Sequence, residues 1–401
     1  MAEGRSVMSR RLLIVGAGFA GAVYARELAE NGYRVDVIDR RPHLGGNAYD
    51  EVSPTGVRVH RYGPHLFHTN NEQAAIWLAR FGAFTPYEHR VVASLPDGRL
   101  TPLPINRRTI SEVFSVRLEG DAEVRDFLAR QAEPIAHPRN AAEFLASRIG
   151  RTLTDLFFRP YTKKMWALDL EDLSAAVVKR IPLRTDDEDR YFPDDRYQML
   201  PRDGYASLFA TILDHTGIKV HLNQAFERPM LAKYAHCFNS MAIDEYFDEA
   251  FGALPYRSVR FHHRDVPLAY REGVPATLNY TDDGRFTRET DWSRLPDHGL
   301  GAHDVKTVTQ EEPCDYRDNA NERFYPVKTS DGRFEAVYAR YKALAKDDER
   351  VTFIGRCGTY QYLDMHQVIS QSRTGAHAWM RRQAPALTAP EPAKQAQAMP
   401  A

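Results

Sequence analysis

The hydrophobic and polar positions near the start of the chain predict a strand, a tight turn, a helix and a second strand. Residues 12–15 form an apolar run of strand type, and from Phe19 to Ala29 the apolar positions recur at helical spacing. Gly32 stands where the C-terminal cap of this helix belongs, and residues 34–39 alternate as a second strand. This order of elements is typical of an α/β protein that opens with a Rossmann-like unit.

A glycine-rich turn lies between the first strand and the helix. Gly16, Gly18 and Gly21 match the pattern G-x-G-x-x-G, and Asp39 ends the second strand about 20 residues later. Such glycines let a pyrophosphate approach the backbone, the helix N-terminus offers free N–H groups, and the aspartate accepts the ribose hydroxyls. A basic residue and a second glycine pair, residues 45–46, follow at once, which is common in FAD enzymes and unnecessary for NAD. The pattern therefore predicts a dinucleotide site and favours FAD over NAD.

Farther along the chain the periodicity changes twice. Helical spacing dominates from about Thr109 to Leu173, whereas short alternating runs from about Tyr256 to Thr309 predict an antiparallel sheet. After Val351 the pattern returns to strand, loop and helix, which is how flavin domains of this type usually close. We therefore predict a discontinuous Rossmann-like FAD-binding domain over residues 10–85, 195–250 and 320–382, an inserted helical substrate lobe over 105–180, an antiparallel sheet domain over 86–104 and 255–318, and disordered ends over 1–9 and 383–401.

Composition narrows the function classes. The chain has 401 residues and a formal net charge of −1, so no global field recruits nucleic acid or an anionic membrane. Its three cysteines, Cys237, Cys314 and Cys357, are widely spaced and form neither a metal motif nor a disulfide framework, which fits a reducing cytosol. No apolar run approaches the roughly 20 residues of a membrane helix, and the N-terminus lacks the apolar segment of a signal peptide. We expect a cytoplasmic protein with no metal, nucleic-acid or membrane partner.

Longer stretches carry a more specific signal. They include GGNAYDE at 45–51, HRYGPHLFHTN at 60–70, RPYTKKMWALDLEDL at 159–173, RYFPDDRYQMLPRDGY at 190–205 and YLDMHQVI at 362–369. In this order, over about residues 10–372, they resemble the prokaryotic UDP-galactopyranose mutase family. The resemblance implies a non-redox isomerisation of UDP-galactopyranose and UDP-galactofuranose, in which N5 of reduced FAD is the covalent nucleophile at the anomeric carbon. It also implies a nucleotide-sugar substrate, an external reductant such as NAD(P)H, and a homodimer.

The resemblance also implies roles for individual residues. With the glycine motifs it gives a cofactor set of Gly16, Gly18, Phe19, Gly21, Asp39, Gly46, Asn47, His65, Leu66, Arg356, Leu363, Asp364 and Met365. The substrate set is His89, Phe157, Tyr161, Thr162, Trp166, Tyr191, Asn279, Tyr325 and Tyr362, and the catalytic set is Arg180, Arg288, His68 and Arg257. Without the resemblance, the aromatic residues at helical spacing, Phe157, Tyr161 and Trp166, would more often be expected in a hydrophobic core.

Two arginines of the catalytic set are expected to clamp the diphosphate. Arg180 belongs to a predicted mobile lid over about residues 178–192, and both it and Arg288 can fork onto phosphate oxygens and stabilise UDP as the leaving group. His68 is expected to tune N5 or position the sugar, and Arg257 to lie near flavin and substrate. Two departures from the family pattern stand out: Ala167 replaces a usual glycine, where we expect little effect, and residues 185–189, TDDED, replace an aromatic–Thr–Phe run.

Several functions therefore stay open at this point. The altered lid leaves room for a related nucleotide sugar, such as an N-acetylated, deoxy or dTDP-linked one. A true FAD oxidoreductase of the amine-oxidase type would share only the FAD domain, and a non-catalytic binder would keep only the fold. The pair Arg180 and Arg288, with the aromatic residues Tyr161 and Trp166, favours a UDP substrate over an amine.

Overall fold

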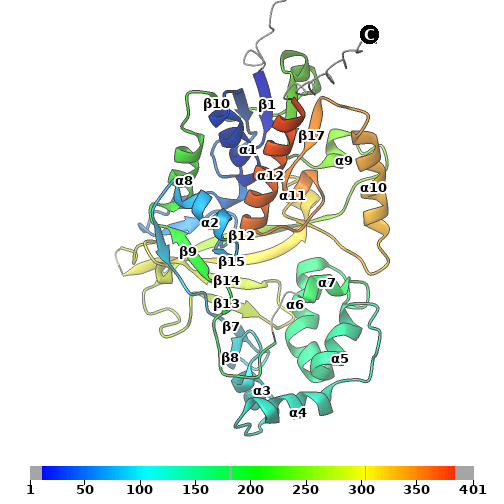
Figure 1. Ribbon diagram of the computed structural model, residues 1–401. Coiled ribbons are helices and arrows are strands. Elements are labelled where there is room, and N and C mark those ends of the chain that lie inside the picture. The colour runs from blue at the N-terminus through cyan, green and yellow to red at the C-terminus, as the bar shows by residue number, and fades with distance from the viewer. Residues whose placement is uncertain (1–10, 180–182, 303, 384–401) are drawn as a thin grey trace, which may run out of the picture.

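A five-stranded parallel sheet forms one end of the molecule, at the top of Figure 1. The computed structural model describes residues 11–179, 183–302 and 304–383. All neighbouring strands are parallel, in the order β10, β2, β1, β11, β17. Their bounds are β1 Arg11–Val15, β2 Arg34–Ile38, β10 Ile218–His221, β11 His236–Asn239 and β17 Val351–Phe353. Because the chain returns to this sheet from distant segments, the predicted discontinuous Rossmann-like domain is confirmed.

Both faces of this sheet are covered, which explains its apolar strands. In β1, Leu12 and Ile14 pack into one hydrophobic core, and Leu13 and Val15 pack into another on the opposite face. Alternate residues of a strand point to opposite faces, so a strand between two layers is apolar throughout. The first core takes side chains from α1 Phe19–Glu30, α2 Glu72–Ala79, α8 Gly204–Leu213 and α12 Met365–Gln383. Helices α9 Ile243–Tyr246, α10 Arg333–Ala345 and α11 Gly355–Gly358 complete this part.

A seven-stranded sheet lies next to the parallel sheet, in the middle of Figure 1. Its order is β16 Tyr325–Pro326, β12 Tyr256–Pro267, β15 Val305–Asp315, β14 Arg288–Asp291, β13 Thr277–Tyr280, β7 Val91–Ser94 and β8 Leu100–Leu103. The predicted antiparallel sheet is confirmed for every pair except β7 and β13, which are parallel. No short hairpin joins β7 to β13, so no turn dictates their relative direction.

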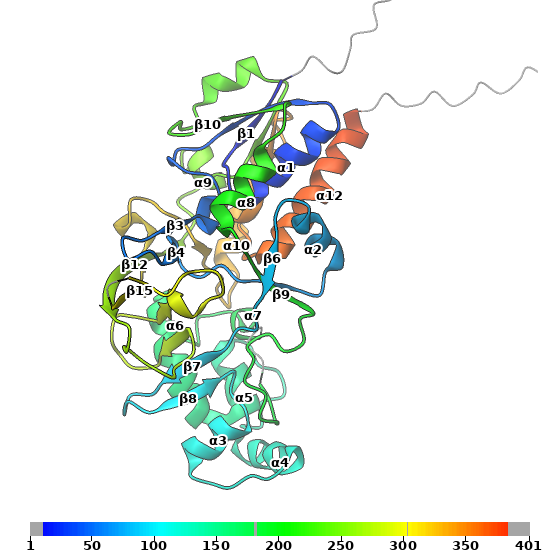
Figure 2. The ribbon, with the colours of Figure 1, turned by 90° about the vertical axis from the view of Figure 1, so that its left-hand side faces the viewer.

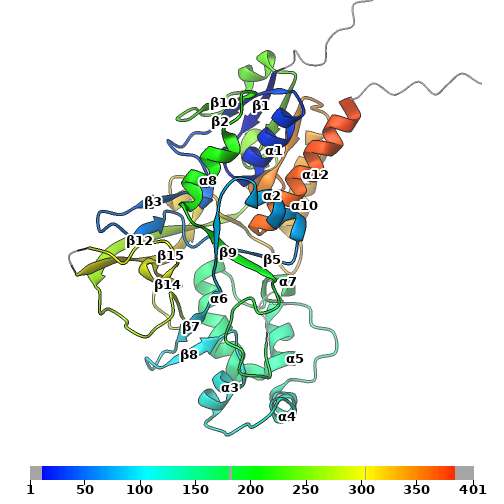
Figure 3. The ribbon, with the colours of Figure 1, turned by 60° about the vertical axis from the view of Figure 1, so that its left-hand side comes forward.

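Two small sheets connect these parts. Strand β3 Asp50–Val52 pairs with β4 Arg58–His60, and β9 Tyr197–Pro201 pairs with both β5 Phe67–Thr69 and β6 Phe84–Pro86. Figure 3 shows β9 beside β5. The segment after the predicted lid therefore lies against the segment that directly follows the predicted cofactor residues His65 and Leu66.

The helical lobe forms the opposite end of the molecule, at the bottom of Figure 2. It contains α3 Arg107–Phe114, α4 Asp121–Gln131, α5 Ala141–Leu153, a π-helical turn at Thr154–Phe158, α6 Arg159–Trp166 and α7 Ala175–Val178, packed around a core of their own. Its entry and exit are tied together. Arg184 N–H donates to the Ile105 carbonyl, and Arg107 N–H donates to the Asp186 carbonyl, each at 2.9 Å.

The described part of the chain ends in a helix, and its helices are too short or too polar to span a membrane. The predicted disordered ends lie outside the described residues, apart from Gln383, which closes α12. The exact domain limits stay predictions.

Candidate active site

A cavity of about 400 Å³ lies at the carboxyl edge of the parallel sheet. Its lining includes Val15, Asp39, Ser240 and Gly355, each at or just after the end of a different strand, which is where open α/β sheets bind ligands. All predicted cofactor residues except Leu66 and Asp364 line it: Gly16, Gly18, Phe19, Gly21, Asp39, Gly46, Asn47, His65, Arg356, Leu363 and Met365. The sequence motifs therefore converge on one cavity.

The glycines of this cavity leave room only for backbone. A Cβ atom on Gly21 would lie 1.8 Å from the Gly16 carbonyl oxygen, and one on Gly46 would lie 2.9 Å from the Gly18 Cα. The two glycine elements thus touch each other, and Gly16 adopts a φ of 101°, which side chains disfavour. No side chain caps the N-terminus of α1, so its N–H groups stay available for an anion. This cradle fits the pyrophosphate of a dinucleotide.

The predicted ribose acid is already held by backbone groups. Asp39 accepts hydrogen bonds from Ala17 N–H at 2.7 Å and from Arg41 N–H at 2.9 Å, which fixes its carboxylate at the mouth of the glycine turn. Arg41 donates to Asn47 Oδ1 at 2.9 Å and pairs with Glu322. Glu322 comes from the third segment of the discontinuous domain. It therefore ties the two halves of the cavity together.

The loop that carries the predicted cofactor residues His65 and Leu66 is anchored by histidines. His65 N–H donates to Nδ1 of His60 at 3.0 Å, and the His65 ring bonds the Gly63 carbonyl at 2.8 Å. Burial lowers the pKa of His65 to about 4, so this ring is neutral at neutral pH. Leu66 packs against the large core, and the Asp364 carbonyl accepts from Val368 N–H at the start of α12. Both lie beside the lining rather than in it.

An aromatic cluster joins the helical lobe to this cavity. The rings of Tyr325 and Tyr362 stack at 5.4 Å with an interplanar angle of 18°, and Trp166, at the end of α6, lies 6.4 Å from each. The guanidinium of Arg356, which also lines the cofactor cavity, lies 5.5 Å from the Tyr325 ring and 5.2 Å from the Tyr362 ring. Arg356 is held there by the carbonyls of Phe324 and Leu363. The predicted substrate residues Tyr325 and Tyr362 and the cofactor cavity therefore share the side chain of Arg356.

Arg288 is the centre of a polar group of four side chains, with Tyr161, Asn279 and Glu311. Its Nη2 donates to the Tyr161 hydroxyl at 3.4 Å, its Nε donates to Asn279 Oδ1 at 3.3 Å, and its Nη1 lies 3.6 Å from Glu311 Oε1. Burial opposes the charge of Arg288 and is the largest single influence, but the Glu311 carboxylate and the neighbouring tyrosines together raise the pKa of the guanidinium. Burial also raises the pKa of Glu311, which Arg288 partly offsets. This group presents a permanent positive charge beside the aromatic cluster.

Arg257 fixes the C-terminal end of α6, the helix that carries Tyr161, Thr162 and Trp166. Arg257 donates to the carbonyls of Met165 at 2.9 Å and Lys164 at 3.3 Å, and so satisfies the C-terminal end of the helix. The structure therefore commits the Arg257 guanidinium to the backbone of α6. Thr162 is buried, and Phe157 lies in the lobe core, where its uridine contact stays a prediction.

Lys164 joins the same helix to the β13–β14 hairpin. Its ammonium donates to the carbonyls of Tyr280 at 3.1 Å, Asp282 at 2.7 Å and Phe286 at 2.8 Å. This hairpin carries Asn279 on one strand and Arg288 on the other. The Lys164 side chain thus fixes α6, which carries Tyr161 and Trp166, relative to the hairpin that carries Arg288.

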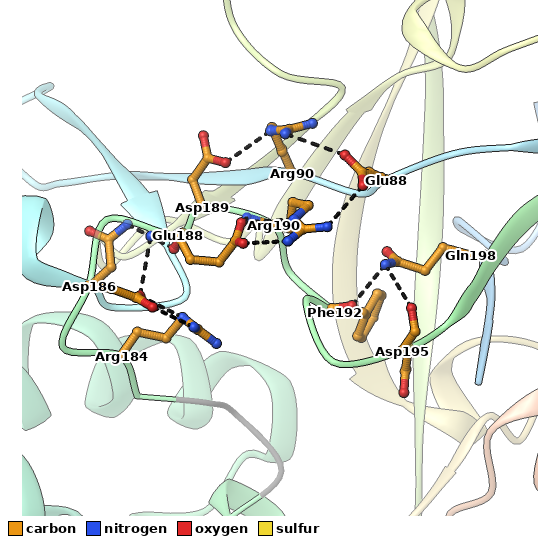
Figure 4. Close-up of polar contacts among 11 residues, drawn as sticks. Glu88, Arg90, Arg184, Asp186, Glu188, Asp189, Arg190, Phe192, Asp195 and Gln198 are labelled. Carbon is orange, nitrogen blue, oxygen red and sulfur yellow. Dashed lines mark hydrogen bonds and ion pairs between the residues drawn. The ribbon is translucent and has the colours of Figure 1, made fainter. Parts of the chain in front are cut away.

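The predicted lid falls partly outside the described residues, and Arg180 is among those left out. The acidic side chains that replace the usual family run each pair with an arginine, mostly as Figure 4 shows. The pairs are Asp186 with Arg184 at 2.6 Å, Asp187 with Arg107, Glu188 with Arg190 at 2.6 Å and Asp189 with Arg90 at 3.0 Å. Each partly exposed pair contributes only about 0–1 kcal/mol. The pairs Asp186–Arg184 and Glu188–Arg190 lie within this segment, whereas Asp187–Arg107 and Asp189–Arg90 attach it to α3 and to the approach of β7.

The predicted histidines His68 and His89 both lie close to one phenylalanine, Phe192. The His68 ring stacks on Phe192 at 3.5 Å and 7°, and the His89 ring lies 6.2 Å from the same ring. Tyr191 N–H donates to the His89 carbonyl at 2.7 Å. Burial lowers the pKa of His89 to about 3, and nearby Arg288 acts in the same direction. His89 is therefore neutral and close to the arginine group.

Sequence reasoning missed several residues of this site. Ser240 follows β11 directly and lines the cavity, and the rule that ligands bind at the carboxyl ends of parallel strands would have found it. Glu311, Lys164 and Glu322 carry no sequence signal of their own, because each acts through a partner that is distant in the chain.

The fold and the site first define a class: a Rossmann-like dinucleotide-binding enzyme with an inserted lobe and a second site of aromatic and arginine side chains. Models of two known families match the chain. The NAD(P)-binding Rossmann-like domain matches residues 14–81, and UDP-galactopyranose mutase matches residues 156–362. The chain belongs to the UDP-galactopyranose mutase family, and it is an isomerase of that type. The Rossmann-like domain supports a dinucleotide cofactor.

Individual relatives agree over nearly the whole chain. A probable UDP-galactopyranose mutase of Klebsiella pneumoniae is 35% identical and covers 91% of this chain and 93% of its own. A dTDP-fucopyranose mutase of Escherichia coli is 34% identical and covers 92% of this chain and 98% of its own. The crystal structure of a reduced UDP-galactopyranose mutase superposes with a TM-score of 0.73 at 15% identity, covering 93% of this chain and 94% of that one, which shows the shared fold.

Proposed function

We propose that the protein interconverts UDP-galactopyranose and UDP-galactofuranose without net redox change, with reduced FAD as its cofactor. The observation that carries the proposal is the placement of Arg288, Tyr161 and Trp166 around one site whose Arg356 also lines the cofactor cavity. A nucleoside diphosphate needs an aromatic surface for its base and a cation for its phosphates. A cationic amine can also use an aromatic surface, but the Arg288 guanidinium would repel it.

The chain's own residues bind and orient the reactants in this proposal. Reduced FAD supplies N5 as the nucleophile for the anomeric carbon. The glycine cradle and Asp39 hold the cofactor, and the cluster of Trp166, Tyr325 and Tyr362 holds the nucleotide. Arg288, kept charged by Glu311, neutralises the diphosphate as it leaves and again as it returns. Arg180 is proposed as the second diphosphate contact.

A related nucleotide sugar is the second candidate substrate. The dTDP-fucopyranose mutase relative is almost as similar to this chain as the Klebsiella relative. The lid segment, with its acid–arginine pairs, also differs from the usual family run. A dTDP-linked deoxy sugar would use the same base surface and the same arginine group.

The deciding experiment measures turnover of both substrates by one preparation. The purified protein, reduced with dithionite under anaerobic conditions, is incubated with UDP-galactofuranose or with dTDP-fucopyranose, and the products are separated by HPLC. We expect conversion of the UDP sugar with no reductant consumed. Preference for the dTDP sugar would replace the proposed substrate. One NAD(P)H oxidised per product would replace the mutase with an oxidoreductase. An external reductant, a homodimer and a cytoplasmic location complete the proposal.

A further inference from the structure

His68 is held by a chain of hydrogen bonds that the proposed function leaves unexplained. Its Nδ1 lies 2.6 Å from Asp195 Oδ2, and Asn70 Nδ2 donates to Asp195 Oδ1 at 3.0 Å. Asn70 in turn accepts from Arg196 N–H at 2.9 Å and donates to the Asp194 carbonyl at 2.8 Å. The pairing of β5 with β9 brings these two distant segments together.

The backbone and the ring plane are fixed as well. Gln198 Nε2 donates to the carbonyls of Phe192 at 2.8 Å and Asp195 at 3.2 Å, as Figure 4 shows. The Phe192 ring lies flat on the His68 ring. The imidazole of His68 therefore has one orientation, set by stacking on one side and by Asp195 at its Nδ1.

This network also determines the tautomer of His68. A carboxylate accepts hydrogen bonds and has none to donate, so Nδ1 must carry the proton in the bond to Asp195. In a neutral imidazole Nε2 then keeps its lone pair. Within the described part of the chain, no protein group is hydrogen-bonded to Nε2. An oriented, partly exposed acceptor remains.

The position of His68 places that acceptor between the two halves of the site. His65 and Met365 line the cofactor cavity, and His366, directly after Met365, lies 6.0 Å from the His68 ring. On the other side, Phe192 connects His68 to His89 and the Arg288 group. In the proposed function, a sugar with its diphosphate at Arg288 and its anomeric carbon at the cofactor therefore lies in the region of this ring.

We propose that His68 carries the proton that the isomerisation moves between two sugar oxygens, and that Asp195 is the positioning residue that makes this possible. The inference rests on the proposed function. In the pyranose-to-furanose direction the C1–O5 bond breaks and O5 gains a proton, while the C1–O4 bond forms and O4 loses one. His68 Nε2, which starts with its lone pair free, takes the proton from O4 and gives it to O5, so the ring ends as it began and the balance closes without a further reactant. The Nδ1–H group of His68 keeps its hydrogen bond to Asp195 throughout.

The network predicts an unusual effect of the near-isosteric substitution Asp195→Asn. Asn70 has a fixed amide, because its Oδ1 already accepts from Arg196, so its Nδ2 must meet the oxygen of the new side chain. The new amide nitrogen then faces His68 Nδ1, which has to accept. The proton moves to Nε2 and blocks the carrier. A sugar hydroxyl can still accept from Nε2–H, so binding is kept while proton transfer is lost.

The test compares four forms of the flavin-loaded enzyme. We expect Asp195→Asn to lower kcat about 10²- to 10⁴-fold with KM changed less than about threefold. Asp194→Asn, which removes an exposed charge one residue away, should match the wild type. The double variant Asn70→Ala, Asp195→Asn frees the amide to rotate and should recover at least about tenfold in kcat over Asp195→Asn. A second substitution that restores activity cannot result from general damage to the fold.

A spectroscopic readout is independent of turnover. Long-range ¹H–¹⁵N spectra of histidine-labelled enzyme, with the His68 signals assigned by their absence in His68→Gln, report which ring nitrogen is protonated. We expect Nδ1–H in the wild type and Nε2–H in Asp195→Asn. A wild type with Nε2–H, or an inverted tautomer with unchanged kcat, would overturn the inference and leave the mutase proposal intact. A wild type without mutase activity would overturn the proposed function, while the spectra would still decide the tautomer.

Discussion

Replacing Lys164 tests whether α6 and the Arg288 hairpin act as one unit. Lys164→Met keeps the length and apolar stem of the side chain but removes an ammonium that is only 11% exposed and bonds three carbonyls. Hydrogen bonds to charged groups are worth about 1.5–3 kcal/mol each, and carbonyls left without a partner cost about 1–3 kcal/mol. Because water reaches part of this hairpin, we expect a total loss of about 2–4 kcal/mol in the free energy of unfolding.

The same change should lower activity more than cofactor binding. Without Lys164 the hairpin is released from α6, and a displacement of Arg288 by about 1 Å can cost about 100-fold in rate. We therefore expect kcat to fall about 10- to 100-fold while the flavin content of the purified protein is unchanged. Burial lowers the pKa of the Lys164 ammonium, and the Asp282 carboxylate partly offsets this effect.

The chain supplies a matched control on the adjacent residue. Lys163 is 55% exposed and pairs only with Asp169, which is also exposed. Lys163→Met should change the unfolding free energy by less than about 0.5 kcal/mol. Urea unfolding and steady-state kinetics of both variants decide the matter. If Lys164→Met and Lys163→Met unfold at the same urea concentration with equal kcat, the hairpin does not depend on α6 and the reasoning is wrong.

Three further outcomes follow from the site and its surroundings. Arg288→Ala, combined with Glu311→Gln so that no buried carboxylate loses its partner, should lower kcat roughly 10- to 150-fold with flavin still bound, and an unchanged kcat would exclude Arg288 as a diphosphate contact. Ala167→Gly should raise the unfolding free energy by up to about 1 kcal/mol, because Ala167 ends α6 at a φ of 55°; urea unfolding that shows a loss would contradict this. Burial lowers the pKa values of His65 and His298 from 6.5 to about 4, so only the unfolded chain binds these protons in between. The unfolding free energy should therefore fall as the pH drops from about 6.5 to about 4, and His298→Gln should flatten that slope; equal slopes would disprove it.

The sequence predicted most reliably what is encoded locally. The strand, glycine turn, helix and second strand over residues 11–38 came from patterns within one short segment, and the glycines needed there have contacts no side chain could tolerate. The parallel pairing of β7 with β13 was missed because it joins segments with no connecting turn. The expectation that Ala167 has little effect stays a prediction, and its left-handed backbone at the end of α6 is the physical reason why a glycine is usual there.

The candidate site also contains residues that local sequence motifs predict and residues that only distant contacts reveal. Residues that line the cofactor cavity were found because their motifs are continuous in sequence. Lys164 and Asp195 were not found, because their partners are the carbonyls of a hairpin and a histidine more than one hundred residues away. The predicted role of Arg257 beside flavin and substrate gains a structural alternative, since its guanidinium holds the end of α6.

The paired ends of the helical lobe make it an exchangeable module. Because residue 105 is hydrogen-bonded to residue 184, and residue 107 to residue 186, the excursion begins and ends at one place. An insertion of this kind can be lengthened, replaced or recombined without rethreading the sheets that hold the cofactor. The lobe carries Tyr161, Thr162 and Trp166, whereas the glycine cradle lies outside it. In the proposed function, nucleotide preference can therefore diverge among proteins of this fold while the cofactor-binding half is kept unchanged.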